Sequence, residues 1–139
     1  MKTLKLTKGD LTIYAGGYEM VTGPAKIVQD LRCALLEPLG NDRFHPGYGS
    51  ILQNFIGGLA SPSQAYYVRQ EISRVVQNYV AVQQDLIARD LLMGKRSRFH
   101  SADVISRVDS IDVIIKEDGF YVTITFTTRS GIIVTTTIS

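Results

Sequence analysis

The chain has 139 residues, of which 45% are hydrophobic and 20% are charged, and its formal net charge is +2. This size suits one domain spanning residues 1–139, and the composition excludes a disordered or collagen-like chain. The small basic excess gives no reason to expect a nucleic acid or an anionic membrane as a partner, because both call for concentrated Lys and Arg.

A single cysteine, Cys33, excludes an internal disulfide framework and fits assembly in a reducing cytoplasm. It lies in a helical apolar pattern, which favours a small buried side chain over a reactive thiol. The sequence has no signal-peptide apolar region and no window near the ~18 continuous apolar residues of a membrane span. We therefore expect neither secretion by a signal peptide nor membrane insertion.

The first predicted element is a small β-hairpin. Its strands are the apolar runs 4–6 and 11–14, separated by the turn-prone Lys8-Gly9-Asp10 and followed by Gly16-Gly17. A first helix is predicted from Pro24 to about Glu37, because proline suits the first helical turn. Its apolar stripe is spaced by four residues: Ile27, Leu31 and Leu35.

Residues 38–50 are dense in turn formers and predict a loop with a structural role, followed by a short helix over 50–56 that Gly57-Gly58 ends. Pro62 then begins a long helix to about Met93. About 30 residues at 1.5 Å each give a rod of about 45 Å, longer than so small a core needs. We expect part of this rod to meet a partner. Its apolar face is predicted as Val68, Ile72, Val75, Val76, Tyr79, Leu86 and Ile87.

The last third predicts a three-stranded antiparallel meander. Its strands are 111–115, 120–127 and 132–138, and the first could extend backwards over 104–108. The fold class is therefore α+β: an N-terminal hairpin, two shorter helices and one long helix packed with a C-terminal antiparallel sheet. We find no internal repeat and no interdomain linker.

No motif points to catalysis, a cofactor or a metal. The two histidines, His45 and His100, have no zinc-ligand spacing with each other or with the cysteine, and no glycine pattern matches a phosphate or dinucleotide loop. The carboxylates Glu37 and Asp42 favour helix-end and loop-tethering roles. Asp42 is interpreted either as a local ion pair with Arg43 or as a turn-stabilising side chain.

A basic run is the best candidate for binding nucleic acid: Arg89, Lys95, Arg96 and Arg98, followed by Phe99 and His100. A cationic cluster at a helix C-terminus is favoured by the helix dipole and by solvation, so we prefer that interpretation. The tyrosines of the long helix, Tyr66, Tyr67 and Tyr79, are interpreted as packing residues.

The final strand is the most informative segment, because it is apolar and β-branched and has neither a charge nor a proline. A bare edge of this kind pairs readily with another chain. We predict that it binds a partner by strand addition; the alternative is a strand that is central in its own sheet. The predicted binding residues are Ile132, Ile133, Val134, Thr135, Thr136, Thr137 and Ile138.

The stretch from Gly9 to about Leu59 resembles the baseplate wedge and sheath-initiator family of contractile phage tails, which includes a small protein formerly labelled lysozyme-like. In that family a β element leads to a glycine before the first helix, then a G-[ED]-R loop, P-x-[FY]-G and another helix. The matching residues are Gly9-Asp10, Val21-Thr22-Gly23, Gln29 and Leu35 of the helix, Gly40-Asn41-Asp42-Arg43, and Pro46-Gly47-Tyr48-Gly49-Ser50.

The loop motif of this resemblance thus consists of Gly40, Asp42, Arg43, Pro46, Tyr48 and Gly49. The sequence departs from the family by lacking Glu-Pro-Arg after the long helix. The resemblance implies a non-enzymatic virion protein of the tail baseplate, assembled in the host cytoplasm. Its implied partners are the tail sheath protein and baseplate wedge proteins, with the tail tube as a further candidate.

Two alternatives stay open beside an enzyme, which we disfavour. The same architecture could serve in a bacterial contractile injection device. It could also be a small cytoplasmic regulatory module that binds a soluble partner.

Overall fold

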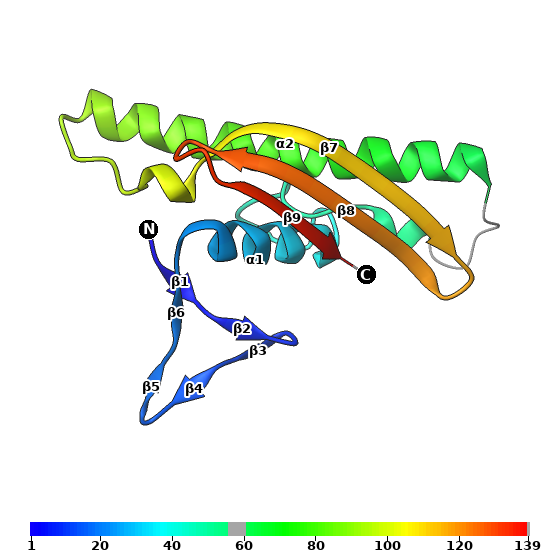
Figure 1. Ribbon diagram of the computed structural model, residues 1–139, viewed down its shortest axis with the longest axis horizontal. Coiled ribbons are helices and arrows are strands. Elements are labelled where there is room, and N and C mark those ends of the chain that lie inside the picture. The colour runs from blue at the N-terminus through cyan, green and yellow to red at the C-terminus, as the bar shows by residue number, and fades with distance from the viewer. Residues whose placement is uncertain (56–60, 139) are drawn as a thin grey trace.

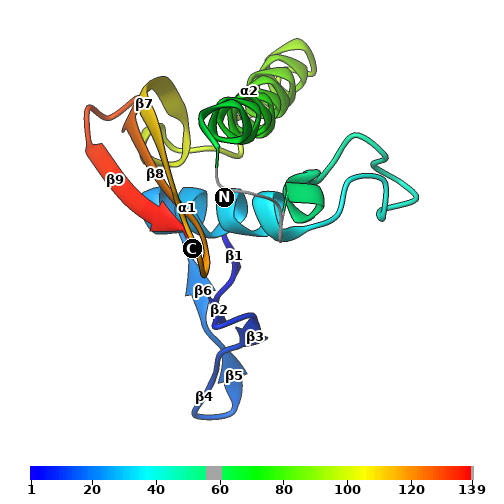
Figure 2. The same ribbon diagram turned by 90° about the vertical axis from the view of Figure 1, so that its right-hand side faces the viewer.

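The computed structural model describes residues 1–55 and 61–138, without the side chain of Tyr14. The chain is mixed α and β, as predicted: two helices lie on one face of a three-stranded sheet, and an N-terminal arm projects from this body (Figure 1, Figure 2). The elements of the body are α1 (Gly23–Leu36), α2 (Pro62–Leu92), β7 (Ile105–Lys116), β8 (Gly119–Thr128) and β9 (Ile133–Ile138).

Both helices begin and end close to the predicted residues. Pro24 lies in the first turn of α1, and the Ser61 side chain caps α2 by accepting a hydrogen bond from the Gln64 N–H at 3.1 Å. Gly94, with φ +64°, follows the last turn of α2. The predicted short helix is instead a 3-10 helix, Leu52–Phe55, and the rest of that prediction, residues 56–58, lies outside the described residues.

The core forms between the helices and the inner face of the sheet. The stripe predicted for α1 is buried, and so are the first four apolar positions predicted for α2. Val122, Ile124 and Phe126 of β8 alternate inward, which confirms the period-two pattern. The buried cluster consists of Ile27, Leu31, Ala34, Leu35, Val68, Ile72, Val75, Val76, Ile105, Ile111, Val122, Ile124, Phe126 and Ile138.

The sheet is the predicted antiparallel meander, in the order β7-β8-β9. The two segments predicted around 104–108 and 111–115 join into the single strand β7. Its pairing with β8 shifts register twice, between Ile105 and Arg107 and between Val108 and Ser110. Such shifts mark β-bulges, which add twist and interrupt the ladder.

The N-terminal arm is not the single hairpin that the sequence predicted. Its six two-residue strands form three separate antiparallel ladders, β1 with β6, β2 with β3, and β4 with β5. Two of the ladders close with two-residue turns in which both residues have positive φ, as in type I′ turns: Lys8-Gly9 and Ala15-Gly16. The strands are Thr3–Leu4, Leu6–Thr7, Asp10–Leu11, Ile13–Tyr14, Gly17–Tyr18 and Met20–Val21.

The three ladders meet at a closed ring of backbone hydrogen bonds. Lys5 N donates to Glu19 O at 2.7 Å, Glu19 N to Thr12 O at 3.1 Å, and Thr12 N to Lys5 O at 3.0 Å. These residues are seven apart, so the arm is a threefold repeat of a seven-residue unit, and the expectation of no internal repeat was wrong. The sequence gives little sign of this repeat, because only one position has the same residue type in all three units: Gly9, Gly16 and Gly23.

The arm is attached to the body at its base. The Gln29 side chain of α1 accepts a hydrogen bond from Leu6 N at 2.9 Å and donates one to Leu4 O at 2.8 Å. At the start of α1, Gly23 N donates at 2.6 Å to the buried carboxylate of Asp103, which also accepts His100 N at 3.1 Å. Both ends of the arm therefore leave the body side by side, through the ladder β1–β6 (Figure 1).

Candidate interaction sites

Strand β9 lies at an edge of the sheet, and the alternative of a central strand is wrong. Thr128 N donates to Ile132 O at 2.9 Å, so these two residues form a hydrogen-bonded pair. In an antiparallel ladder such pairs recur at every second residue. Val134, Thr136 and Ile138 therefore exchange backbone hydrogen bonds with β8. The backbone N–H and C=O groups of the residues between them point away from β8: Ile133, Thr135 and Thr137.

The side chains of β9 divide between the two faces of the sheet. Those of Val134, Thr136 and Ile138 face the helices, whereas Ile133, Thr135 and Thr137 are exposed on the outer face. Two threonine pairs bridge β8 and β9 there, with Oγ1 atoms 3.3 Å apart for Thr123–Thr137 and 3.2 Å apart for Thr125–Thr135. The predicted binding residues thus supply an open backbone edge and two unlike side-chain faces.

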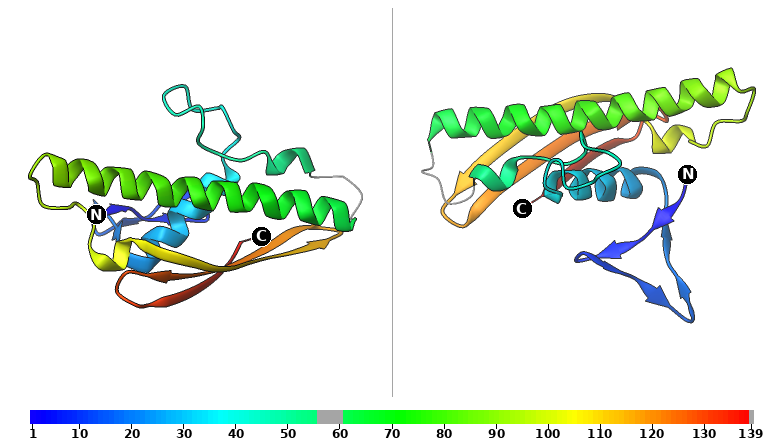
Figure 3. Two further views of the ribbon diagram at one scale, coloured as in Figure 1. Left: turned by 90° about the horizontal axis from the view of Figure 1, so that it is seen from above. Right: turned by 180° about the vertical axis from the view of Figure 1, so that it is seen from behind.

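The opposite edge, β7, is protected in three ways. It contains the two register shifts, and α2 runs alongside it (Figure 3). It also carries charged side chains, including the ion pair of Arg107 with Asp109 at 2.6 Å. Bulges, charges and covering elements are the usual means of preventing edge-to-edge association, and β9 has no bulge and no charge. Within residues 1–55 and 61–138, these protective features belong to the β7 edge.

The loop after α1 is closed at its neck by a parallel bridge between Pro38 and Ser50. Ser50 N donates to Glu37 O at 2.8 Å, and the Ser50 hydroxyl donates to Leu35 O at 2.6 Å. Gly49 has φ +102°, and a Cβ at this position would lie 2.6 Å from Glu37 O. The last glycine of the predicted loop motif is therefore required by a close approach of two backbone segments.

Helix α2 holds this neck from the other side. Arg74 donates to Gly49 O at 2.9 Å and to the Glu71 carboxylate at 2.7 Å, and Glu71 accepts Ile51 N at 3.0 Å. The hydrogen bond from Arg74, helped by that from Ile51, holds the pKa of Glu71 below its ordinary value against the effect of burial. Sequence reasoning missed this clamp, because its members are 20 and 25 residues apart.

At the tip of the loop, Asp42 stabilises a turn, as one of the two interpretations predicted. Its carboxylate accepts Phe44 N at 2.9 Å and His45 N at 3.3 Å, and pairs with the His45 ring at 2.9 Å. The other interpretation, an ion pair of Asp42 with Arg43, was wrong, because the partner of the carboxylate is His45. The hydrogen bond from His45, together with those from the backbone, lowers the pKa of Asp42.

The other motif residues have separate positions in the loop. Gly40 turns the chain with φ +81°, while Arg43 and Pro46 are exposed. Tyr48 is half-buried at the base, where burial raises its pKa to about 12. The loop thus presents Arg43 and the fully exposed Phe44 outward on a fixed neck.

Both ends of α2 expose large apolar side chains. Leu91, Leu92 and Met93 form one exposed cluster at the C-terminal end. At the other end Tyr66 and Tyr67 contact each other edge to face, with ring centroids 5.7 Å apart, and are exposed. The packing interpretation was therefore wrong for these two tyrosines, and Val82 in the middle of α2 is exposed as well.

The basic run is partly neutralised by carboxylates. The Arg98 guanidinium donates to the buried Asp90 at 2.7 and 3.0 Å, and Arg89 pairs with Asp85 at 2.9 Å across exposed side chains. The hydrogen bonds from Arg98 lower the pKa of Asp90 to about 2, from an ordinary 3.8. Lys95 and Arg96 remain exposed.

Replacing Asp90 with Asn should destabilise the protein at neutral pH, with a difference from wild type that shrinks as pH falls. A depressed folded-state pKa contributes stability that is complete above about pH 4 and lost towards about pH 2. Urea unfolding followed by circular dichroism across this range measures the difference. The control Asp85→Asn removes the exposed pair and should change little; a difference for Asp90→Asn that stays constant with pH would contradict the assignment.

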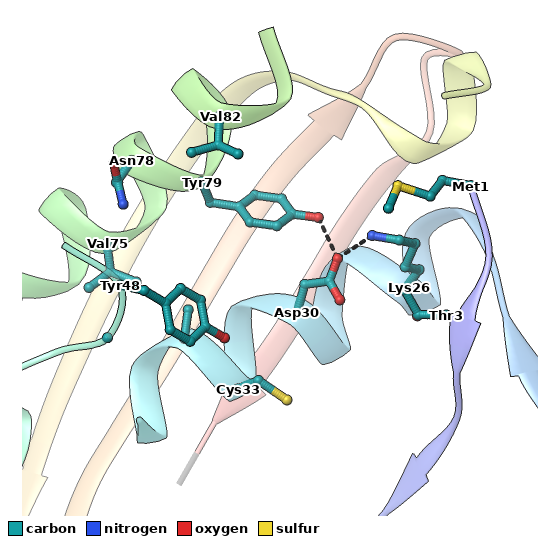
Figure 4. Close-up of a pocket in the computed structure, with 12 residues that line it drawn as sticks. Met1, Thr3, Lys26, Asp30, Cys33, Tyr48, Val75, Asn78, Tyr79 and Val82 are labelled. Atoms are coloured by element: carbon teal, nitrogen blue, oxygen red, sulfur yellow. Dashed lines mark hydrogen bonds and ion pairs between the residues drawn. The ribbon is translucent and has the colours of Figure 1, made fainter. Parts of the chain in front are cut away.

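A cavity of about 340 Å³ lies between α1, α2 and the start of the chain (Figure 4). Inside it the buried Lys26 pairs with Asp30, which also accepts the Tyr79 hydroxyl at 2.8 Å. Burial, followed by the nearby Asp30, raises the pKa of both Tyr79 and Cys33, so the half-buried thiol in the cavity wall is a poor nucleophile. Sequence analysis missed this network, although the i,i+4 spacing of Lys26 and Asp30 could have indicated it.

Within residues 1–55 and 61–138, no helix is both long and apolar enough to cross a membrane. The same residues contain no group of three His, Cys, Asp or Glu side chains placed to hold a metal ion. A scan against protein-family models finds no match for the chain, and a search of curated proteins finds no relative.

Proposed function

We propose that this chain is a non-enzymatic subunit of a contractile-tail baseplate that joins wedge proteins and starts sheath assembly. The observation that carries the proposal is the unequal protection of the sheet edges. β7 is bulged, charged and flanked by α2, whereas β9 offers a regular, uncharged backbone edge. An added strand from the first sheath ring would bond to this edge, and the alternating side chains would set its register.

The family resemblance over Gly9 to about Leu59 supports the choice of assembly, and the loop that carries its motif has a rigid, clamped neck. The wedge contact is assigned to the exposed ends of α2. Its C-terminal cluster, Leu91, Leu92 and Met93, is a group of adjacent large apolar side chains of the kind that binds partners.

The test is co-expression of the chain with the sheath and wedge proteins encoded beside it, followed by pull-down and electron microscopy. We expect co-purification with both, and we expect a chain without residues 132–139 to lose the sheath protein and keep the wedge proteins. Circular dichroism of the shortened chain checks that its helices are intact. Sheath assembly on baseplates that contain the shortened chain would refute strand addition, and isolation of the full chain as a monomer would favour a regulatory module.

A further inference from the structure

An apolar groove lies beside Ile138. The last described pair of the β8–β9 ladder joins Val122 to Ile138, and Gly119 to Tyr121 of β8 pair with β7. The groove, of about 320 Å³, lies at this corner of the sheet, between the end of α1 and the 3-10 helix. Its apolar walls are Leu35, Leu36, Leu52, Phe120, Val122 and Ile138.

Leu36 shows that the groove is incompletely covered. It is the last residue of α1 and is 60% exposed, although its neighbour Leu35 is 2% exposed in the core. The apolar surface of the core therefore continues to the outside at this point, next to the end of the open edge. A strand added at the β9 edge could bury this exposed apolar side chain and also bond to the outward-pointing backbone groups of β9.

The geometry of strand pairing determines which side chain of the added strand meets the groove. Residues directly opposite each other in neighbouring strands have side chains on the same face, with Cβ atoms about 4.5–5.5 Å apart. The side chain of Ile138 faces inward, so the residue opposite it also points inward, to the face of the sheet on which the groove lies. Residues opposite Thr135 and Thr137 point to the outer, threonine-lined face.

We infer that the segment accepted by β9 is an extended strand of alternating character, with a large aliphatic side chain opposite Ile138 that fills this groove. Opposite Thr135 and Thr137 it carries polar or β-branched side chains. The inference rests on the proposed function, since it specifies the sheath segment that strand addition requires. It also assigns Leu36, which lies outside β9, to the binding site.

The test compares three variants of the full chain in binding to the co-expressed sheath protein. Leu36→Lys should weaken binding about tenfold, because it removes one buried leucine contact. It should still fold, because the side chain is exposed and a cation is favourable at a helix C-terminus. The matched control is Ile114→Lys on β7, where the isoleucine is 58% exposed and belongs to neither proposed contact, so this variant should bind the sheath protein as wild type does. The third variant, Thr135→Pro, blocks the backbone edge itself.

The outcomes separate the two ideas. Weakening by Leu36→Lys without weakening by Ile114→Lys supports the groove. If Thr135→Pro prevents binding while Leu36→Lys binds as wild type, strand addition stands and the groove inference is wrong. If Thr135→Pro binds as wild type, strand addition fails and the inference fails with it.

Discussion

Replacing Thr135 with proline should leave the protein folded and stop it from recruiting the sheath protein. The Thr135 N–H points away from β8, so its loss removes none of the hydrogen bonds between β8 and β9. Proline is tolerated on an edge strand in this orientation. In the variant, however, the carbonyl group of an added strand would face the pyrrolidine ring of proline and would have no N–H donor. One buried acceptor left without a donor costs about 1–3 kcal/mol, so binding should fall by about 5-fold to about 150-fold.

Two companion variants make this result specific. Thr136→Pro removes an N–H that bonds to β8, and should destabilise the fold by roughly 3 kcal/mol, as in other regular structures. Thr135→Val keeps the backbone donor and the β-branched shape, and should bind the sheath protein almost normally. Pull-down with the sheath protein and thermal unfolding measure both properties. Equal sheath binding by Thr135→Pro and Thr135→Val would show that the edge backbone is not the contact.

Replacing Gly49 with Ala should strongly destabilise the protein. The added Cβ would lie 2.6 Å from Glu37 O and 2.9 Å from the carbonyl carbon of Pro38, and φ is +102°. Since these contacts are with backbone, a side-chain rotation cannot relieve them. Backbone strain and overpacking together give a loss of about 2–4 kcal/mol, measured by urea unfolding.

Gly40 supplies the control for this prediction. Its φ is also positive, +81°, but a Cβ there has no neighbour within 4 Å. Gly40→Ala should therefore cost about 1–2 kcal/mol, from backbone conformation alone. If the two alanine variants lose equal stability, crowding at the neck does not explain the requirement for Gly49.

Local signals predicted the elements of the body. Pro24 and Pro62 mark the helix starts, Gly94 marks an end, and alternation along 120–127 marks a half-buried strand. Each of these signals acts within a few residues, which is why single-sequence reasoning could find them. The N-terminal arm was misread because its closing ladder pairs Thr3 with Val21, and no local pattern specifies that pairing.

The candidate site was predictable only in part. The absence of charge along 132–138 indicated an edge strand, but the side of β9 that each N–H faces depends on the register with β8. The clamp of Arg74 on Gly49 joins a helix to a loop 25 residues away, and so depends on the tertiary fold. The groove beside Leu36 likewise depends on the tertiary fold, because its walls come from α1, the 3-10 helix, β8 and β9.

The joined base of the N-terminal arm has a consequence for how this protein can evolve. The arm enters and leaves the body through β1 and β6, which lie side by side, and its other two ladders pair residues of the arm with one another. Segments with adjacent ends tolerate changes in length with little cost to the rest of the fold. Gain or loss of whole units would change how far the arm reaches and leave the sheet edge and the loop neck in place, so descendants could adapt to new neighbours through this arm alone.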